Sequence, residues 1–299
     1  MRLDDERESS NVDDRRGSSS GFAGGMGRGI PSIGTIMFIW PLIRGLLKTK
    51  FGWALIAIGA IAYFSGFNPL SLVTGGSTSH TSSSKQDEKS AIFIKKVLAS
   101  TEDVWSQVLP KYGIRYRAPQ MVLFNGKTTS GCGIASANMG PFYCPADQKV
   151  YLDLSFFNEL ASRHNSPGDF AQAYVLAHEV GHHIQNMLGT LNKVQRLKQS
   201  WGGQNTAKSN ALQVRVELQA DCYAGVWGHY AQTKFHQLER GDVEEAIQAA
   251  GSIGDDTLQK EAQGYVTPEN FTHGTSKQRV EWFLRGFKSG DLRACNTFK

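Results

Sequence analysis

Two histidines four positions apart, His178 and His182, stand in the segment His178-Glu-Val-Gly-His182. On a helix, residues i and i+4 share one face, so both imidazoles can reach a single ion. Imidazole nitrogen is a ligand that suits Zn²⁺. Glu179 follows His178 and could take a proton from a water molecule activated at such a metal. The pattern predicts two metal ligands and a general base, with a helix carrying two surface histidines as the alternative.

A catalytic zinc site with two histidines needs a third protein ligand. A histidine shortly after the motif is excluded, because Gln185 and Leu188 stand where that class of site requires Gly and His. Glu217 follows His182 by 35 residues, in a segment predicted to be helical, and Asp221 comes one turn later. We expect Glu217 to be the third ligand and Asp221 to accept a hydrogen bond from a ligand histidine, which fixes the tautomer. A solvated helical face is the alternative for this pair, although its neighbours are apolar.

Two further histidines need separate interpretations. His273 lies in the segment Thr272-His-Gly-Thr-Ser276 and could donate to an oxyanion that forms during hydrolysis. An equally good interpretation is that this loop caps the next helix through Thr275 or Ser276. His183 lies about 100° round the helix from His182, so we do not expect it to bind the same metal.

The composition is that of a folded protein with room for a packed core. Of the 299 residues, 40% are hydrophobic and 20% are charged, which excludes a wholly disordered chain. The net charge is +5, and no long run of basic residues indicates nucleic-acid binding.

Hydrophobic periodicity predicts an α+β domain, mostly helical with a small sheet. Strands are expected at 121–124 and 149–154, the second as an edge strand to which a peptide could add. Helices are expected at 90–109, 155–163, 169–188, 209–232, 242–251, 255–263 and 275–288.

Residues 51–84 contain no Asp, Glu, Lys or Arg. Within them, residues 51–70 form an apolar stretch long enough to cross a bilayer, with Trp53 and Tyr63 near its ends. This stretch predicts a transmembrane signal-anchor helix that contacts the lipid bilayer. A buried core helix and a cleaved signal peptide are the alternatives, and both fit the sequence less well. A cleaved signal peptide would need a much shorter charged region before the apolar stretch.

The basic residues Arg44, Lys48 and Lys50 directly precede the apolar stretch, and the next basic residue is Lys85. The positive-inside rule then predicts a single-pass protein of the bacterial inner (cell) membrane. Its N-terminus would be cytoplasmic, and its main domain would be periplasmic or extracellular.

The predicted domain boundaries follow from these segments. Residues 1–50 are expected to be a cytoplasmic polar tail, and its apolar part, within 30–47, to lie at the membrane interface. If 30–47 crossed the membrane instead, the main domain would be cytoplasmic. Residues 71–88 read as a Gly/Ser/Thr linker, and 89–299 as the metal-binding domain.

No two of the four cysteines have the Cys-x-x-Cys spacing, which argues against a cysteine-based zinc site. The simplest of three pairings joins Cys132 to Cys144 and Cys222 to Cys295. Both disulfides would require an oxidising compartment. Buried free thiols are the alternative.

The spacing of the zinc-site residues resembles that of thermolysin-type zinc metallopeptidases, whose third ligand is a glutamate. The wider sequence is similar to the bacterial neutral zinc metallopeptidase family over nearly its whole length. The similar strings include Arg7–Arg16, Ser130-Gly-Cys-Gly133, Gly140-Pro-Phe-Tyr-Cys-Pro145, Tyr151–Leu154, His178–Gln185 and Phe271-Thr-His-Gly-Thr-Ser276. The resemblance implies a zincin-like domain on one membrane anchor, acting on peptides, without implying a particular substrate.

These observations predict a membrane-anchored zinc endopeptidase in which a metal-activated water molecule and the base Glu179 hydrolyse peptide bonds of a peptide or protein substrate. The alternative is a catalytically silent, zinc-binding interaction module tethered to the membrane. Glu179 argues against the alternative, because a purely structural site does not need an adjacent base.

Overall fold

The computed structural model describes residues 1–17, 85–163, 166, 168–203 and 206–299. The predicted span 51–70, the apolar part of 30–47 and most of the linker 71–88 lie outside these residues. Within the described part of the chain, no helix is long and apolar enough to cross a membrane.

A four-stranded sheet has the order β1-β2-β6-β5. β1 and β2 pair in parallel, as do β2 and β6, whereas β5 runs antiparallel to β6. A separate hairpin is formed by β3 and β4. The strands are β1 (Val12–Asp14), β2 (Gln120–Phe124), β3 (Lys127–Ser130), β4 (Gly133–Ser136), β5 (Phe142–Cys144) and β6 (Lys149–Asp153).

The prediction that residues 149–154 form an edge strand is wrong in one respect. They do form a strand, β6, but it lies between β2 and β5, and β5 is the edge. After Cys144 the chain turns through Gln148, whose φ is 59°, and returns as β6 beside the strand it has just left. β5 is too short to be recognised from alternation of polar and apolar residues.

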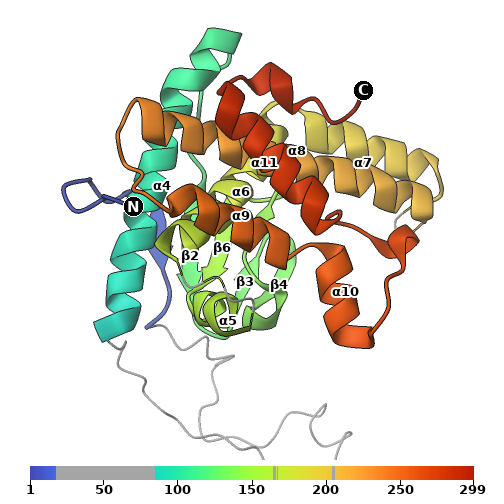
Figure 1. Cartoon of the computed structure of the whole chain (residues 1–299), viewed down its shortest axis with the longest axis horizontal. Helices are drawn as coiled ribbons and strands as arrows, with labels where there is room; N and C mark the ends of the chain where they lie inside the picture. Colours follow the sequence, from blue (N-terminus) through green and yellow to red (C-terminus); the bar gives the residue numbers. More distant parts are fainter. Residues whose placement is uncertain (18–84, 164–165, 167, 204–205) are drawn as a thin grey trace, which may run out of the picture. The chain divides into compact units, whose positions relative to one another are not determined.

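Helices make up most of the described chain (Figure 1). α6 packs against α4, α8 and α9, and α11 packs against α8 and α9. The predicted helices are all present, with ends that differ by a few residues. The α-helices are α4 (Lys85–Val108), α5 (Ser155–Arg163), α6 (Asp169–Met187), α7 (Thr190–Ser200), α8 (Ala207–Thr233), α9 (Asp242–Ser252), α10 (Asp255–Gln263) and α11 (Ser276–Ser289).

Helix α7 was not predicted from the sequence. Gly189 has a φ of 75° and is the N-cap of α7, just after the helix that carries the histidines. The two helices are therefore joined by a sharp turn. Because α7 has few apolar residues, its periodicity is weak, but Val194 is buried against α8 residues.

Residues 1–17 differ from the predicted cytoplasmic tail, because they belong to the same compact unit as residues 83–299. Met1 and Leu3 are buried in the core cluster that also contains residues of α4 and α6. Val12–Asp14 forms β1 at one edge of the sheet. The segment was read as polar because its charged residues outnumber its few apolar ones.

A close approach of α6 and α8 brings the two halves of the predicted metal site together. Gly181, between the two motif histidines, faces the backbone of Ala220 on α8. A β-carbon at position 181 would lie 2.9 Å from the Ala220 carbonyl oxygen, closer than real contacts allow. The absence of a side chain at Gly181 therefore sets the distance between the two helices.

Candidate metal centre

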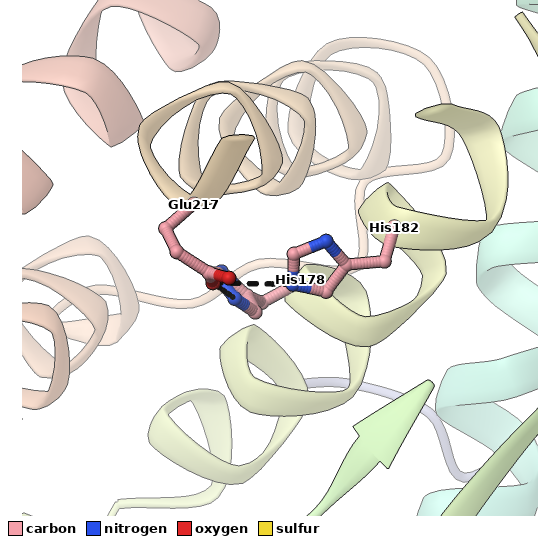
Figure 2. A group of neighbouring side chains, drawn as sticks. All are labelled: His178, His182 and Glu217. Carbon is pink, nitrogen blue, oxygen red and sulfur yellow. Dashed lines mark hydrogen bonds and ion pairs between the residues drawn. The ribbon is translucent and has the colours of Figure 1, made fainter. Parts of the chain in front are cut away.

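His178 and His182 extend from α6 toward Glu217, which extends from α8 (Figure 2). Nε2 of His178 and Nε2 of His182 each lie 3.2 Å from Oε2 of Glu217. One potential ligand atom from each residue lies within 4.8 Å of the other two. All three predicted ligands therefore converge on one point, as binding of a single ion requires.

The Nδ1 atoms of both histidines are engaged by oxygen acceptors. Nδ1 of His178 lies 2.8 Å from Oδ1 of Asp221, as predicted for that carboxylate. Nδ1 of His182 lies 2.9 Å from Oε1 of Gln185, whose amide group donates to the carbonyl oxygen of Val216 on α8. A proton on Nδ1 leaves the Nε2 lone pair available to a metal. Two nitrogen donors and one carboxylate oxygen fit a catalytic zinc site.

Asp221 is fully buried, and its carboxylate also accepts hydrogen bonds from two residues that were not identified from the sequence. Nε and Nη2 of Arg279, on α11, each donate to the Asp221 carboxylate at 3.0 Å. The hydroxyl of Tyr174 donates to Asp221 Oδ1 at 2.5 Å. Arg279 lies 58 residues after Asp221, and no sequence pattern links them. The network fixes the carboxylate that in turn fixes His178.

These buried charges shift one another's pKa values. Burial alone lowers the pKa of His178, but the Asp221 and Glu217 carboxylates outweigh it and raise that pKa to about 10. Burial would raise the pKa values of both carboxyls, but neighbouring cationic groups reverse this. His182 and His178 hold the pKa of Glu217 well below its ordinary value, and Arg279 and His178 lower that of Asp221. Because a metal competes with the proton for histidine nitrogen, metal binding at this site must release protons.

Glu179 lies beside the ligands but is held differently. Its side chain is buried and lies close to the backbone of Tyr143 on β5. Burial raises the pKa of the Glu179 carboxyl, and the two histidines partly oppose this effect. A carboxyl with a raised pKa, close to a metal but outside its ligand set, is suited to accept and return protons.

A cleft of about 910 Å³ contains the three ligands and Glu179. One wall is formed by β5 residues, including Phe142 and Tyr143, and another by α7 residues, including Val194 and Lys198. Lys198 Nζ donates to Gln213 Oε1 at 2.5 Å, and Gln213 Nε2 donates to Glu217 Oε1 at 2.7 Å. The cleft leads from the protein surface to the convergent ligands.

His273 also lines this cleft, with 49% of its side chain exposed. Its Nδ1 lies 3.1 Å from Asp255 Oδ1, and its backbone N–H donates to Asp255 Oδ2 at 2.6 Å. Asp255, the first residue of α10, was not identified from the sequence. The capping interpretation also holds, because Thr275 forms a capping box with Gln278 at the start of α11. One loop thus both caps a helix and presents His273 to the cleft.

The remaining predicted residues have clear positions. Nε2 of His183 donates to the Arg117 carbonyl at 2.6 Å, so that histidine points away from the ligands as expected. Both predicted disulfides are present, Cys132–Cys144 and Cys222–Cys295, and the first borders the cleft through Cys132.

A second group of three carboxylates, from Asp169, Asp242 and Glu245, is also compact. The Met1 amino group lies 2.7 Å from Asp169 Oδ2 and 3.4 Å from Asp242 Oδ2. The Met1 ammonium group thus offsets part of their negative charge within the chain, and we assign no metal to them.

A family model described as Putative neutral zinc metallopeptidase matches residues 1–298. The chain belongs to this family. The match agrees with the resemblance read from the motifs, and it makes zinc the metal that the family implies at the three convergent ligands.

Two curated relatives illustrate the similarity. The chain is 46% identical over 302 residues to the Escherichia coli (strain K12) protein named "Uncharacterized protein YpfJ", covering 100% of this chain and 99% of that protein. It is 44% identical over 209 residues to "Uncharacterized protein Mb2605" of Mycobacterium bovis, covering 67% of each. No solved structure matches the chain.

Proposed function

We propose that the chain is a zinc-dependent endopeptidase anchored in a membrane. The observation that carries this proposal is the convergence of His178, His182 and Glu217 beside Glu179, a fourth buried group that is not one of the convergent ligands. A structural zinc site is usually closed by four protein ligands, whereas a catalytic site keeps a position for water or substrate.

In this proposal the residues have separate tasks. His178, His182 and Glu217 would hold the zinc ion, and Asp221 and Gln185 orient the two imidazoles. Zinc supplies Lewis acidity, which lowers the pKa of a water molecule and polarises a carbonyl group. Glu179 accepts the proton of the attacking water and returns it to the leaving amine.

His273 is the proposed donor to the carbonyl oxygen as negative charge develops on it. Two observations support this role. The side chain lines the same cleft as the ligands. Asp255 accepts from its Nδ1, so an imidazole that carries protons on both nitrogens can donate from Nε2 into the cleft.

β5 is the strand that we propose binds the substrate. It forms one edge of the sheet and one wall of the cleft, and the backbone of its Tyr143 lies close to Glu179. An extended peptide could add to this edge by backbone hydrogen bonds, which depend little on side-chain identity. A peptide so bound would pass close to the base and the ligands.

A metal-depletion experiment on the full chain in detergent tests the proposal. Zinc is removed with a chelator, cleavage of an unfolded protein is measured, and Zn²⁺ is added back. We expect chelation to abolish cleavage and Zn²⁺ to restore it in wild type but not in Glu179→Gln. Tight zinc binding without any cleavage would instead support the silent interaction module.

A further inference from the structure

We propose that residues 1–17 and 85–299 lie on the same side of the membrane, and that this is the oxidising side. This replaces the single-pass arrangement predicted from hydropathy, which puts the two parts on opposite sides. The proposal assumes a membrane anchor but does not depend on peptidase activity.

The first observation is that residues 1–17 complete the sheet. β1 lies beside β2 in parallel. The Met121 amide donates to the Asn11 carbonyl at 2.8 Å, and the Arg15 amide donates to the Leu123 carbonyl at 2.7 Å. Removing β1 would expose the edge of β2, whose unpaired backbone groups and apolar side chains would face water.

The second observation is a set of buried polar contacts between residues 1–17 and α4. Glu102 on α4 is 8% exposed. Its Oε1 accepts hydrogen bonds from the Ser9 hydroxyl at 2.5 Å and from the Asn11 amide at 2.8 Å. Lys96 Nζ donates to the carbonyl oxygens of Leu3 and Asp4 at 2.7 and 2.6 Å. Separating the two parts would leave a buried carboxylate without these donors, which is costly.

The third observation is a set of contacts between the end of the first described part and the start of the second. Arg16, near the end of the first part, donates from Nη1 to the Asp87 carbonyl at 3.1 Å. Its Nη2 also lies 3.1 Å from Glu88 Oε2. Asp87 and Glu88 are in the first turn of α4. The first described part therefore ends beside the start of the second on one folded unit, and a bilayer cannot separate them.

The side follows from the cysteines. All four cysteines form disulfides, which persist in oxidising compartments.

Single-cysteine labelling of the full chain in bacterial cells tests the proposal. Glu8→Cys reports on the first part and Lys288→Cys on the second. Glu8 and Lys288 are both exposed, so their substitution should not disturb the fold. A thiol reagent that cannot cross the inner membrane is added to cells with a permeabilised outer membrane, and wild type, with its cysteines in disulfides, gives the background.

We expect Glu8→Cys and Lys288→Cys to be labelled equally before lysis. Labelling of Lys288→Cys but not Glu8→Cys in intact cells would overturn the proposal in favour of a single crossing. Protection of both until lysis, with reactive thiols in wild type, would overturn the assignment to the oxidising side.

Discussion

The side of the cleft formed by α6, α8 and α11 is closed to solvent, whereas the loop before α11 is open to it. On the closed side, His178, Glu217 and Asp221 are buried, and each has side-chain partners on another helix. On the open side, the His273 side chain is half-exposed and depends on one carboxylate, Asp255.

This difference separates two tasks. The closed side holds the ligand atoms in fixed positions before any metal or substrate arrives, which lowers the cost of ordering them on binding. The open side leaves room for a polypeptide to enter. Substitutions of the ligands and of the residues that hold them on the closed side should therefore affect folding and metal binding, and those on the open side should affect turnover alone.

Arg279→Met should give the largest effect on folding. It leaves the fully buried Asp221 carboxylate without its cation, and breaking a buried ion pair in this way costs about 3–5 kcal/mol. Arg279 lowers the pKa of Asp221 in the folded state, so its stabilising effect is present at neutral pH and is lost as the pH falls below about 4. Thermal unfolding at pH 7 measures the loss.

Lys277→Met on the same helix is the matched control, because Lys277 is 85% exposed and forms a 3.8 Å ion pair with Glu281 on the same helix. Its melting temperature should stay close to that of wild type. An equal loss of thermal stability in both variants would contradict the role given to the Asp221–Arg279 pair.

His273→Ala should reduce kcat about 10²–10³-fold, the usual cost of removing one oxyanion donor, without changing zinc content. His273→Gln keeps a hydrogen-bond donor and should recover part of the activity. Steady-state cleavage and elemental analysis of the same samples measure both quantities. A parallel fall in zinc content would mean that the open side also holds the metal.

Gly181→Ala tests whether the close approach of α6 and α8 positions the ligands. The added methyl group would meet the Ala220 backbone, and such overpacking typically costs about 1–3 kcal/mol. Zinc affinity should fall although every donor atom is retained. Gly251→Ala on α9 is the control, since its methyl group would meet only Val280 at 3.8 Å. Unchanged zinc affinity in Gly181→Ala would show that the helices tolerate wider separation.

The smallest effect concerns pH. Burial raises the pKa of Glu179, and the protonated carboxyl cannot act as a base. Activity should therefore decline as the pH falls through that pKa, at a higher pH than the ordinary value of about 4.3 for glutamate. A profile of kcat/KM against pH measures the midpoint, and an acid limb at or below the ordinary value would contradict the assignment.

The sequence was most informative where the signal is local. α5 and α10 have the bounds predicted from periodicity, and the motif on α6 identifies His178 and His182 because ligands on one helix have a fixed spacing. Glu217 could be proposed because a zinc site must have a third ligand and a buried acidic residue was available on a later helix.

The remainder depends on contacts between distant segments. Arg279 meets Asp221 only because α11 packs on α8, and Gly181 matters only because Ala220 lies opposite. β1 has three residues and pairs with a strand more than a hundred residues later in the sequence, so its charged surroundings were read as a tail. Neither composition nor periodicity reports such contacts.

The most direct test of the central claim is zinc content and turnover measured together in Glu179→Gln and Glu217→Ala. Glu179→Gln should keep about one zinc per chain and lose about 10²–10⁴-fold in turnover, because it removes a general base and no ligand. Glu217→Ala should lose the zinc, because it removes a ligand. Zinc lost from Glu179→Gln but retained by Glu217→Ala would contradict the account, as would zinc-loaded Glu179→Gln with wild-type turnover.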